Sequence, residues 1–347
     1  MIKELIFGIV GGLGLFIYGI WEMSEGLHKA SGERMRRILH NLTGSPLKGV
    51  LVGAGITSVI QSSSATTVMV VGFVNAGLMT LRQALGVIFG ANIGTTITAQ
   101  LIAFKLTDYA LLIIGLGMLV VFISKKKTHK YVGEFLLGFG ILFLGLNILT
   151  KAVKPLGGYA WFNNLFIRFG KNPILGIFAG ALVTAILQSS SVTTGMVLGL
   201  AMANLIDLTS ALPLILGCNI GTCVTALIAS VGTSISAKRA AIAHLMFNVI
   251  GVVIFLPILS IFRNFILHTS GSLARQIANA HTFFNVINTI IFLPFVGLYV
   301  KFLNKIVKGK EEEEMEYLPK YLERHLLNTP PIAIEAAIKE IIRTLNL

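Results

Sequence analysis

The segment Gln61-Ser62-Ser63-Ser64-Ala65-Thr66-Thr67 occurs twice in this chain, the second time as Gln188-Ser189-Ser190-Ser191-Val192-Thr193-Thr194. The second copy starts 127 positions after the first. Another motif recurs at the same offset, as Gly90-Ala91-Asn92-Ile93-Gly94-Thr95-Thr96 and Gly217-Cys218-Asn219-Ile220-Gly221-Thr222-Cys223. One constant offset over so many positions indicates an internal repeat. The sequence therefore predicts two duplicated halves.

The composition places these halves in a membrane. Only 12% of the 347 residues are charged, whereas a soluble domain has about 25%. The mean hydropathy is +0.82, and apolar blocks recur from Leu5 to Phe302, many near the roughly 20 residues that a spanning helix needs. We expect an all-α polytopic protein in contact with the lipid bilayer. The net charge of +13 fits basic cytoplasmic loops better than a nucleic-acid partner.

The signature segments interrupt apolar arms that are too short to span a bilayer. Each arm has about 14 residues, or about 21 Å of helix, against a hydrocarbon core of roughly 30 Å. We therefore predict re-entrant helical hairpins at 47–78 and 174–206. Glycine permits local unwinding, so the Asn-Ile-Gly-Thr motifs predict broken transmembrane helices at 82–104 and 209–229.

Basic residues suggest how the halves are oriented. If the run Lys125–Lys130 is cytoplasmic, counting spans puts the first hairpin on the cytoplasmic side and the second on the opposite side. This is an inverted-topology repeat, common in secondary transporters, although Arg168 and Lys171 then fall outside. The predicted domains are repeat 1 (1–127), repeat 2 with the final helices (128–304) and a charged, amphipathic cytoplasmic tail (305–347).

The repeated motifs have the chemistry of an ion site. Irregular backbone at membrane depth must line a cavity or be buried in protein. The motifs offer hydroxyls, amides and helix N-termini, which attract anions, while carbonyl and hydroxyl oxygens suit a small cation such as sodium. A neutral pocket of this kind binds an anion and cations together better than either alone, because isolated charge in a low dielectric is costly.

Both signatures, both Gly-x-Asn-Ile-Gly-Thr motifs and the flanking Met69–Gly77 resemble the type II sodium–phosphate cotransporter family, in its bacterial branch. The resemblance implies sodium-driven uptake of inorganic phosphate by alternating access across the inner (plasma) membrane, with sodium as coupling ion and no other cofactor. It implies a phosphate site lined by Gln61, Ser62, Ser63, Ser64, Gln188, Ser189, Ser190 and Ser191. The candidate sodium ligands are then Thr66, Thr67, Asn92, Thr95, Thr193, Thr194, Asn219 and Thr222. The segment 321–330 resembles the connector to the soluble PhoU-like domain of many bacterial relatives.

A second, shorter repeat lies downstream. His244, Phe247 and Asn248 recur 37 positions later as His281, Phe284 and Asn285. In a helix each trio lies on one face. We interpret His244, Asn248, His281 and Asn285 as residues that brace a broken helix or the repeat interface by hydrogen bonds, or alternatively as groups for gating or proton sensing.

Other functions share part of this chemistry. The same groups could serve another small oxyanion or a dicarboxylate, or an anion channel. A serine hydrolase needs a base beside its nucleophile, but neither signature contains Lys or His and the chain has no Gly-x-Ser-x-Gly elbow. We therefore expect a transporter rather than an enzyme. The last span lacks an obvious repeat partner and is a candidate homodimer surface.

Overall fold

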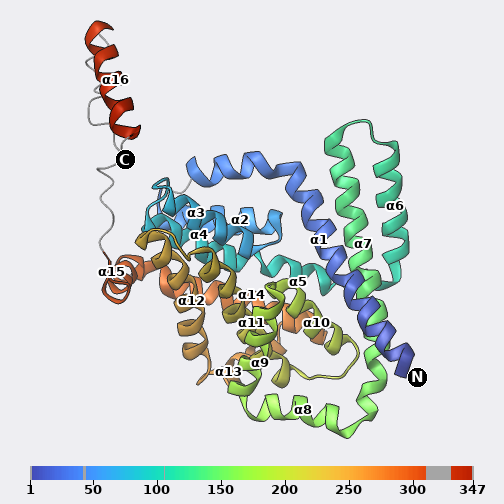
Figure 1. Cartoon of the computed structure of the whole chain (residues 1–347). Coiled ribbons are helices and arrows are strands. Elements are labelled where there is room, and N and C mark those ends of the chain that lie inside the picture. Colours follow the sequence, from blue (N-terminus) through green and yellow to red (C-terminus); the bar gives the residue numbers. More distant parts are fainter. Residues whose placement is uncertain (1, 42–43, 105, 310–329, 346–347) are drawn as a thin grey trace. The chain divides into compact units, whose positions relative to one another are not determined.

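A computed structural model describes residues 2–41, 44–104, 106–309 and 330–345 (Figure 1). The chain divides into two compact units, Met1–Lys308 and Gly309–Leu347, and the described part of the second is the amphipathic helix α16 (Pro330–Leu345). In the first unit the described residues form only helices. These are α1 (Ile2–Asn41), α2 (Pro46–Ile60), α3 (Ser63–Asn75), α4 (Leu81–Gly94), α5 (Thr96–Ile102), η1 (Leu106–Tyr109), α6 (Ala110–Ile123), α7 (Lys127–Val153), η2 (Lys154–Gly158), α8 (Ala160–Lys171), α9 (Pro173–Leu187), α10 (Ser190–Met202), α11 (Leu208–Ala229), α12 (Ile235–Phe255), α13 (Leu259–Leu267), α14 (Leu273–Phe292), η3 (Leu293–Phe295) and α15 (Val296–Ile306).

Seven helical stretches of the described chain are long and apolar enough to cross a membrane. They are Lys3–Ala30, Leu81–Ile102, Leu106–Ile123, Lys127–Gly158, Leu208–Ala229, Ile235–Phe255 and Leu273–Ile306. This confirms the expected all-α membrane protein. The first apolar block, which starts near Leu5, lies in a helix longer than a bilayer requires, because α1 continues as far as Asn41.

The signature segments form helix–turn–helix pairs. α2 and α3 meet at the first signature, and α9 and α10 meet at the second (Figure 1). In each pair the chain folds back on itself, since the hydroxyl of Thr57 donates to Thr66 across the first turn (2.9 Å) and that of Thr184 donates to Thr193 across the second (3.0 Å). These helices have only 13 to 15 residues, so none can span a bilayer alone. That they re-enter from one side of the membrane remains a prediction.

The prediction of a broken helix at the Asn-Ile-Gly-Thr motif is wrong in the second half. In the first half the interruption is a single residue. α11 is one continuous helix through Gly217–Cys223. Between α4 and α5 only Thr95 intervenes, and its backbone is helical (φ −64°, ψ −22°). The reason is that these glycines serve close packing rather than unwinding.

Each of these glycines meets the backbone of a hairpin helix. A Cβ on Gly217 would collide with the carbonyl oxygen of Ile177 in α9, and one on Gly90 would collide with that of Val50 in α2. Small residues allow two helix backbones to approach closely in this way. The first arm of each hairpin is therefore held directly against the motif helix of its own half.

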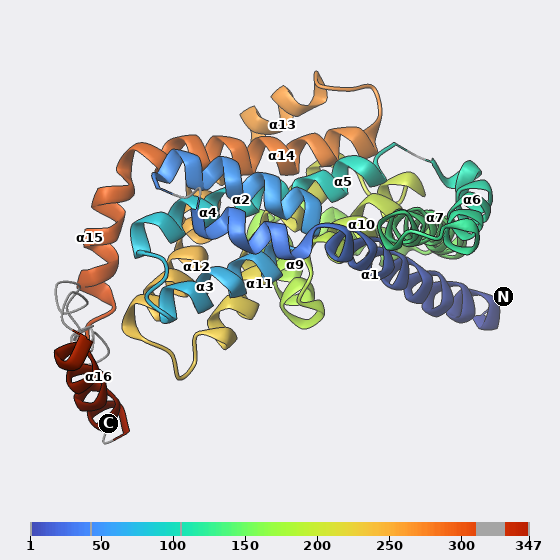
Figure 2. The ribbon, with the colours of Figure 1, turned by 90° about the horizontal axis from the view of Figure 1, so that it is seen from above.

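The helices that open the two halves cross each other through repeated glycines. Gly12 of α1 meets Gly145 of α7, and Gly19 of α1 meets Gly138 of α7. In the sequence, Gly12 matches Gly138 and Gly19 matches Gly145, both at an offset of 126 positions. The contact is therefore reciprocal, and the two helices cross antiparallel. Figure 2 shows α6, α7 and the N-terminal part of α1 on one side of the first unit, with the hairpins and α4, α11, α12 and α14 on the other.

The packing role of Gly217 can be tested with Gly217→Ala. The added methyl must displace the α9 backbone, and such overpacking costs about 1–3 kcal/mol, so we expect a lower melting temperature of the purified protein in detergent. Gly72→Ala in α3 is the matched control, because nothing lies within 4 Å of its Cβ position. Alanine is the better helix former there by about 1 kcal/mol. Equal melting temperatures for both variants would contradict the packing role.

Candidate functional site

The first signature turn is built from Gln61 and Ser62. Gln61 ends α2 in the left-handed region (φ 60°), and Ser62 begins α3 in an extended conformation. The Ser62 hydroxyl accepts a hydrogen bond from the backbone N–H of Ala65 (3.1 Å). This N-cap takes up one of the donors that the first turn of a helix leaves unpaired. The remaining N–H groups and the hydroxyls of Ser63 and Ser64 are concentrated at the turn.

The second turn repeats this geometry. Gln188 ends α9 at φ 54°, and Ser189 caps α10 by accepting from the N–H of Val192 (3.3 Å). Ser190 and Ser191 are buried in the first turn of α10, as Ser63 is in α3. Two serine-rich helix N-termini with the same local structure are thus present.

The two signatures lie together in space, although 127 positions separate them. The hydroxyl of Ser64 donates to the backbone oxygen of Gln188 (3.4 Å). The hydroxyl of Ser191 donates to Thr98 of α5 (3.3 Å), which itself donates to the side-chain oxygen of Gln61 (2.6 Å). Thr98 is a contact residue that sequence reasoning missed. Its signal was present, because it is a polar residue in an apolar helix and recurs 127 positions later as Thr225.

The candidate sodium ligands at the turns fall into two groups. Thr66 and Thr193 are engaged within their own hairpins, where their hydroxyls donate to the carbonyls of Ser62 and Ser189 (both 3.2 Å). Thr67 and Thr194 are buried, and their hydroxyl oxygens have no hydrogen-bond partner in the described chain. A buried unpaired oxygen is costly, so this second pair is better suited to an ion.

The motif asparagines lie beside the histidine trios. Asn92 donates to the carbonyl of Ile88, and its Oδ1 accepts from Nε2 of His244 (3.4 Å). Asn219 donates to Ile215, and its Oδ1 accepts from Nε2 of His281 (3.3 Å). The two trios thus join α12 to the motif helix of the first half and α14 to that of the second.

The remaining candidate residues of the motifs and histidine trios are also buried. Asn248 and Asn285 donate to the carbonyls of His244 and His281, one turn earlier in their helices. Thr222 donates to the carbonyl of Cys218 (2.9 Å), and Thr95 is buried where α4 meets α5. The structure therefore places the asparagines and histidines in helix packing and the signatures at the turns.

A cavity of about 560 Å³ opens beside the turns. Its lining residues are His28, Ile60, Ser64, Ala65, Val68, Met69, Gln188, Thr225 and Ile228. Both signatures contribute to this wall, and His28 is its one ionisable residue among those described. Five of its nine lining residues are apolar, and its polar groups are the hydroxyls of Ser64 and Thr225, the Gln188 amide and the His28 imidazole.

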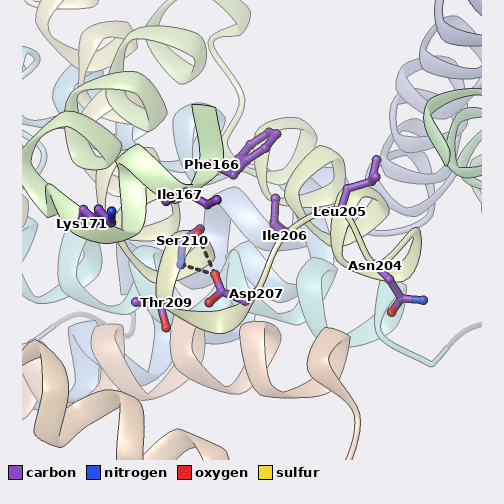
Figure 3. A pocket seen from close by; sticks show the side chains of 9 residues that line it. All are labelled: Phe166, Ile167, Lys171, Asn204, Leu205, Ile206, Asp207, Thr209 and Ser210. Atoms are coloured by element: carbon purple, nitrogen blue, oxygen red, sulfur yellow. Dashed lines mark hydrogen bonds between the residues drawn. The ribbon is translucent and has the colours of Figure 1, made fainter. Parts of the chain in front are cut away.

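A second cavity, of about 490 Å³, lies at the start of α11 (Figure 3). There the Asp207 carboxylate accepts from both the N–H (2.9 Å) and the hydroxyl (2.6 Å) of Ser210. Burial opposes ionisation of Asp207, but the hydrogen bonds from Ser210, with a further one from Thr209, outweigh it and the pKa of the carboxyl is lowered. This cavity is also lined by Lys171 and contains no signature residue, so we assign the candidate site to the signature turns.

The chain resembles known proteins along most of its length. The family model described as Na+/Pi-cotransporter matches twice, at residues 15–151 and 150–291. The uncharacterized protein YqeW of Bacillus subtilis is 33% identical over 76% of this chain and 85% of its own length. The putative inorganic phosphate export protein YjbB of Salmonella typhimurium is 27% identical over 96% of this chain, which spans 62% of that relative.

A shorter match extends to animals. The human sodium-dependent phosphate transport protein 2B is 38% identical over 35% of this chain and 19% of its own length. No solved structure matches the chain. Since the family model matches both halves and covers well over half of the residues, the chain belongs to the Na+/Pi-cotransporter family.

Proposed function

We propose that this protein is a secondary active transporter that couples sodium to the movement of inorganic phosphate. The observation that carries the proposal is the meeting of the two signature turns, joined by the hydrogen bond from Ser64 to Gln188. Two serine-rich helix N-termini converge there beside an open cavity. Helix N-termini bind phosphate through unpaired N–H groups and the helix dipole.

Sodium fits the same place for a separate reason. The buried, unpaired hydroxyls of Thr67 and Thr194 supply oxygen ligands at matched positions in the two hairpins. Phosphate carries negative charge, and sodium compensates it in surroundings where isolated charge is costly. Each ion therefore improves the binding of the other, which is the coupling that cotransport requires. The division of ligands between the two ions is part of the proposal.

The reciprocal crossing of α1 and α7 supports an inverted repeat. Equivalent helices that cross antiparallel are expected if the halves have opposite orientations in the membrane. The two matches of the family model also support two repeats. We propose repeat 1 at 1–127 and repeat 2 at 128–304, in the inner membrane, with Lys125–Lys130 and the tail from 305 on the cytoplasmic side. A homodimer remains a proposal.

Energetics favour uptake as the direction of transport. An inward sodium gradient drives uptake in a symporter, so this is the direction we propose. Export is the second candidate, because several bacterial relatives are named for putative inorganic phosphate export. A coupled transporter runs in the direction that its combined gradients favour, so an assay must measure both influx and efflux.

The proposed coupling predicts sodium-dependent accumulation of labelled phosphate in proteoliposomes. With an inward sodium gradient, phosphate should rise above its equilibrium level, whereas a matched potassium gradient should give only equilibration. Preloaded vesicles should release phosphate when the sodium gradient is reversed. Equal transport in sodium and potassium by protein shown to be folded would contradict the coupling, and competition by sulfate or succinate would point to another anion.

The site assignment predicts that Ser63→Ala and Ser190→Ala each reduce phosphate uptake. Hydrogen bonds to a charged group contribute about 1.5–3 kcal/mol, so we expect roughly a 10-fold or greater loss of apparent phosphate affinity. Ser124→Ala, at the turn between α6 and α7, is the matched control and should transport normally. Melting temperatures in detergent should be unchanged in all three variants. Normal uptake in both signature variants would refute the site.

A further inference from the structure

One contact at the signature turns differs between the two halves. In the first half, the Thr98 hydroxyl donates to the side-chain oxygen of Gln61 (2.6 Å), and Gln61 is only 3% exposed. The counterparts 127 positions later are Gln188 and Thr225. Gln188 is exposed, Thr225 donates to the carbonyl of Thr222 (2.9 Å), and both residues line the 560 Å³ cavity. The Gln61–Thr98 pair is hydrogen-bonded, and we call it closed. Gln188 and Thr225 do not form the equivalent bond, so we call this pair open, and both residues face the cavity.

The serines that follow show the same difference. Ser191 donates to Thr98, so the closed pair also holds the second hairpin. Its counterpart Ser64 does not repeat this contact with Thr225, and donates instead to the backbone oxygen of Gln188. Ser64 and Thr225 both line the cavity. A shift of the hairpins that joined Gln188 and Ser64 to Thr225 would therefore close this cavity.

Several other contacts of the site are equivalent in the two halves. The threonine bonds across the turns, the serine N-caps and the asparagine–histidine bonds occur in both halves with similar distances. General divergence of the two turn structures therefore does not explain the difference between the Gln61–Thr98 and Gln188–Thr225 pairs. At the cavity beside the turns, the two halves differ in the contacts of Thr98 and Thr225.

We propose that Thr98 and Thr225 are positioning residues that gate the site, each by bonding the signature glutamine of its own half, with only one pair closed at a time. The described structure is the state with the Gln61–Thr98 pair closed. In the opposite state the Gln188–Thr225 pair is closed, the cavity beside Ser64 is shut, and Gln61 is released. This inference rests on the proposed function, since it assigns the two states through which a transported ion passes.

The proposal predicts opposite effects of two equivalent substitutions. Thr98→Val removes the hydroxyl that stabilises the described state, and Thr225→Val removes the one that stabilises the opposite state. A hydrogen bond contributes about 0.5–1.5 kcal/mol net, so each change should shift the balance between states roughly 2- to 10-fold. The reporter is Val68→Cys, a cavity-lining position without a role in the proposed site.

The measurement is the rate at which a charged, water-soluble thiol reagent modifies the thiol introduced by Val68→Cys in the purified full chain. Thr98→Val should slow the modification, by at most the stated factor, and Thr225→Val should accelerate it. The double variant should return toward the parent rate. Thr98→Ser and Thr225→Ser retain the hydroxyl and should behave like the parent. The native Cys218 and Cys223 are buried, so protein without Val68→Cys serves as the blank.

A purely structural role for the threonines would change both rates in the same direction, and that result, or no change in either, would overturn the gating assignment. The rates are measured without phosphate or sodium. If the two modification rates shift in opposite directions but the protein shows no sodium-dependent phosphate uptake, the gating assignment stands and phosphate is rejected as the substrate. Normal uptake with no rate shifts would reject the gating residues alone.

Discussion

The fold depends on one constraint: a polar turn among apolar helices must satisfy its own hydrogen-bonding groups. A left-handed backbone at a residue other than glycine costs roughly 1–2 kcal/mol, yet both turns place a glutamine there. At the first turn the glutamine amide donates to the carbonyl of Ser58 and accepts from Thr98. The serine that follows caps the next helix. The glutamine and the serine thus end one helix and start the next, and this leaves a helix N-terminus at each turn.

Glycine packing fixes these turns relative to the rest of the first unit. The first arm of each hairpin lies against α4 or α11, where glycines leave room for its backbone. The two halves are joined by reciprocal glycine contacts between α1 and α7. Lipid supplies no hydrophobic force between helices, so close van der Waals packing and buried hydrogen bonds must hold them together. The asparagine–histidine bonds add polar contacts of this kind to the motif helices.

A site with little fixed charge suits a transporter for physical reasons. A permanent charged side chain would hold a counter-ion tightly and slow its release. Hydroxyls, amides and helix termini instead bind an ion pair whose charges compensate each other. Duplicated halves add a second property, because two arrangements that exchange the roles of equivalent residues have similar free energies. A difference as small as one or two hydrogen bonds is then enough to select between them.

The sequence by itself determined the two repeats, the helical membrane class and the positions of the turns, because these follow from a constant offset, from the length of apolar segments and from local capping chemistry. It also supplied the family resemblance and the candidate site residues, apart from Thr98. Only the tertiary structure decided that α11 continues through its motif, since a glycine in sequence is compatible with both unwinding and close packing, and the approach of α9 selects packing. The contact of Thr98 with Gln61 likewise depends on how α5 packs against the end of α2, because the two residues are 37 positions apart in the sequence. The difference between the two turns also required the structure, because duplicated motifs are alike in sequence and only the packing of the whole unit makes their surroundings unequal.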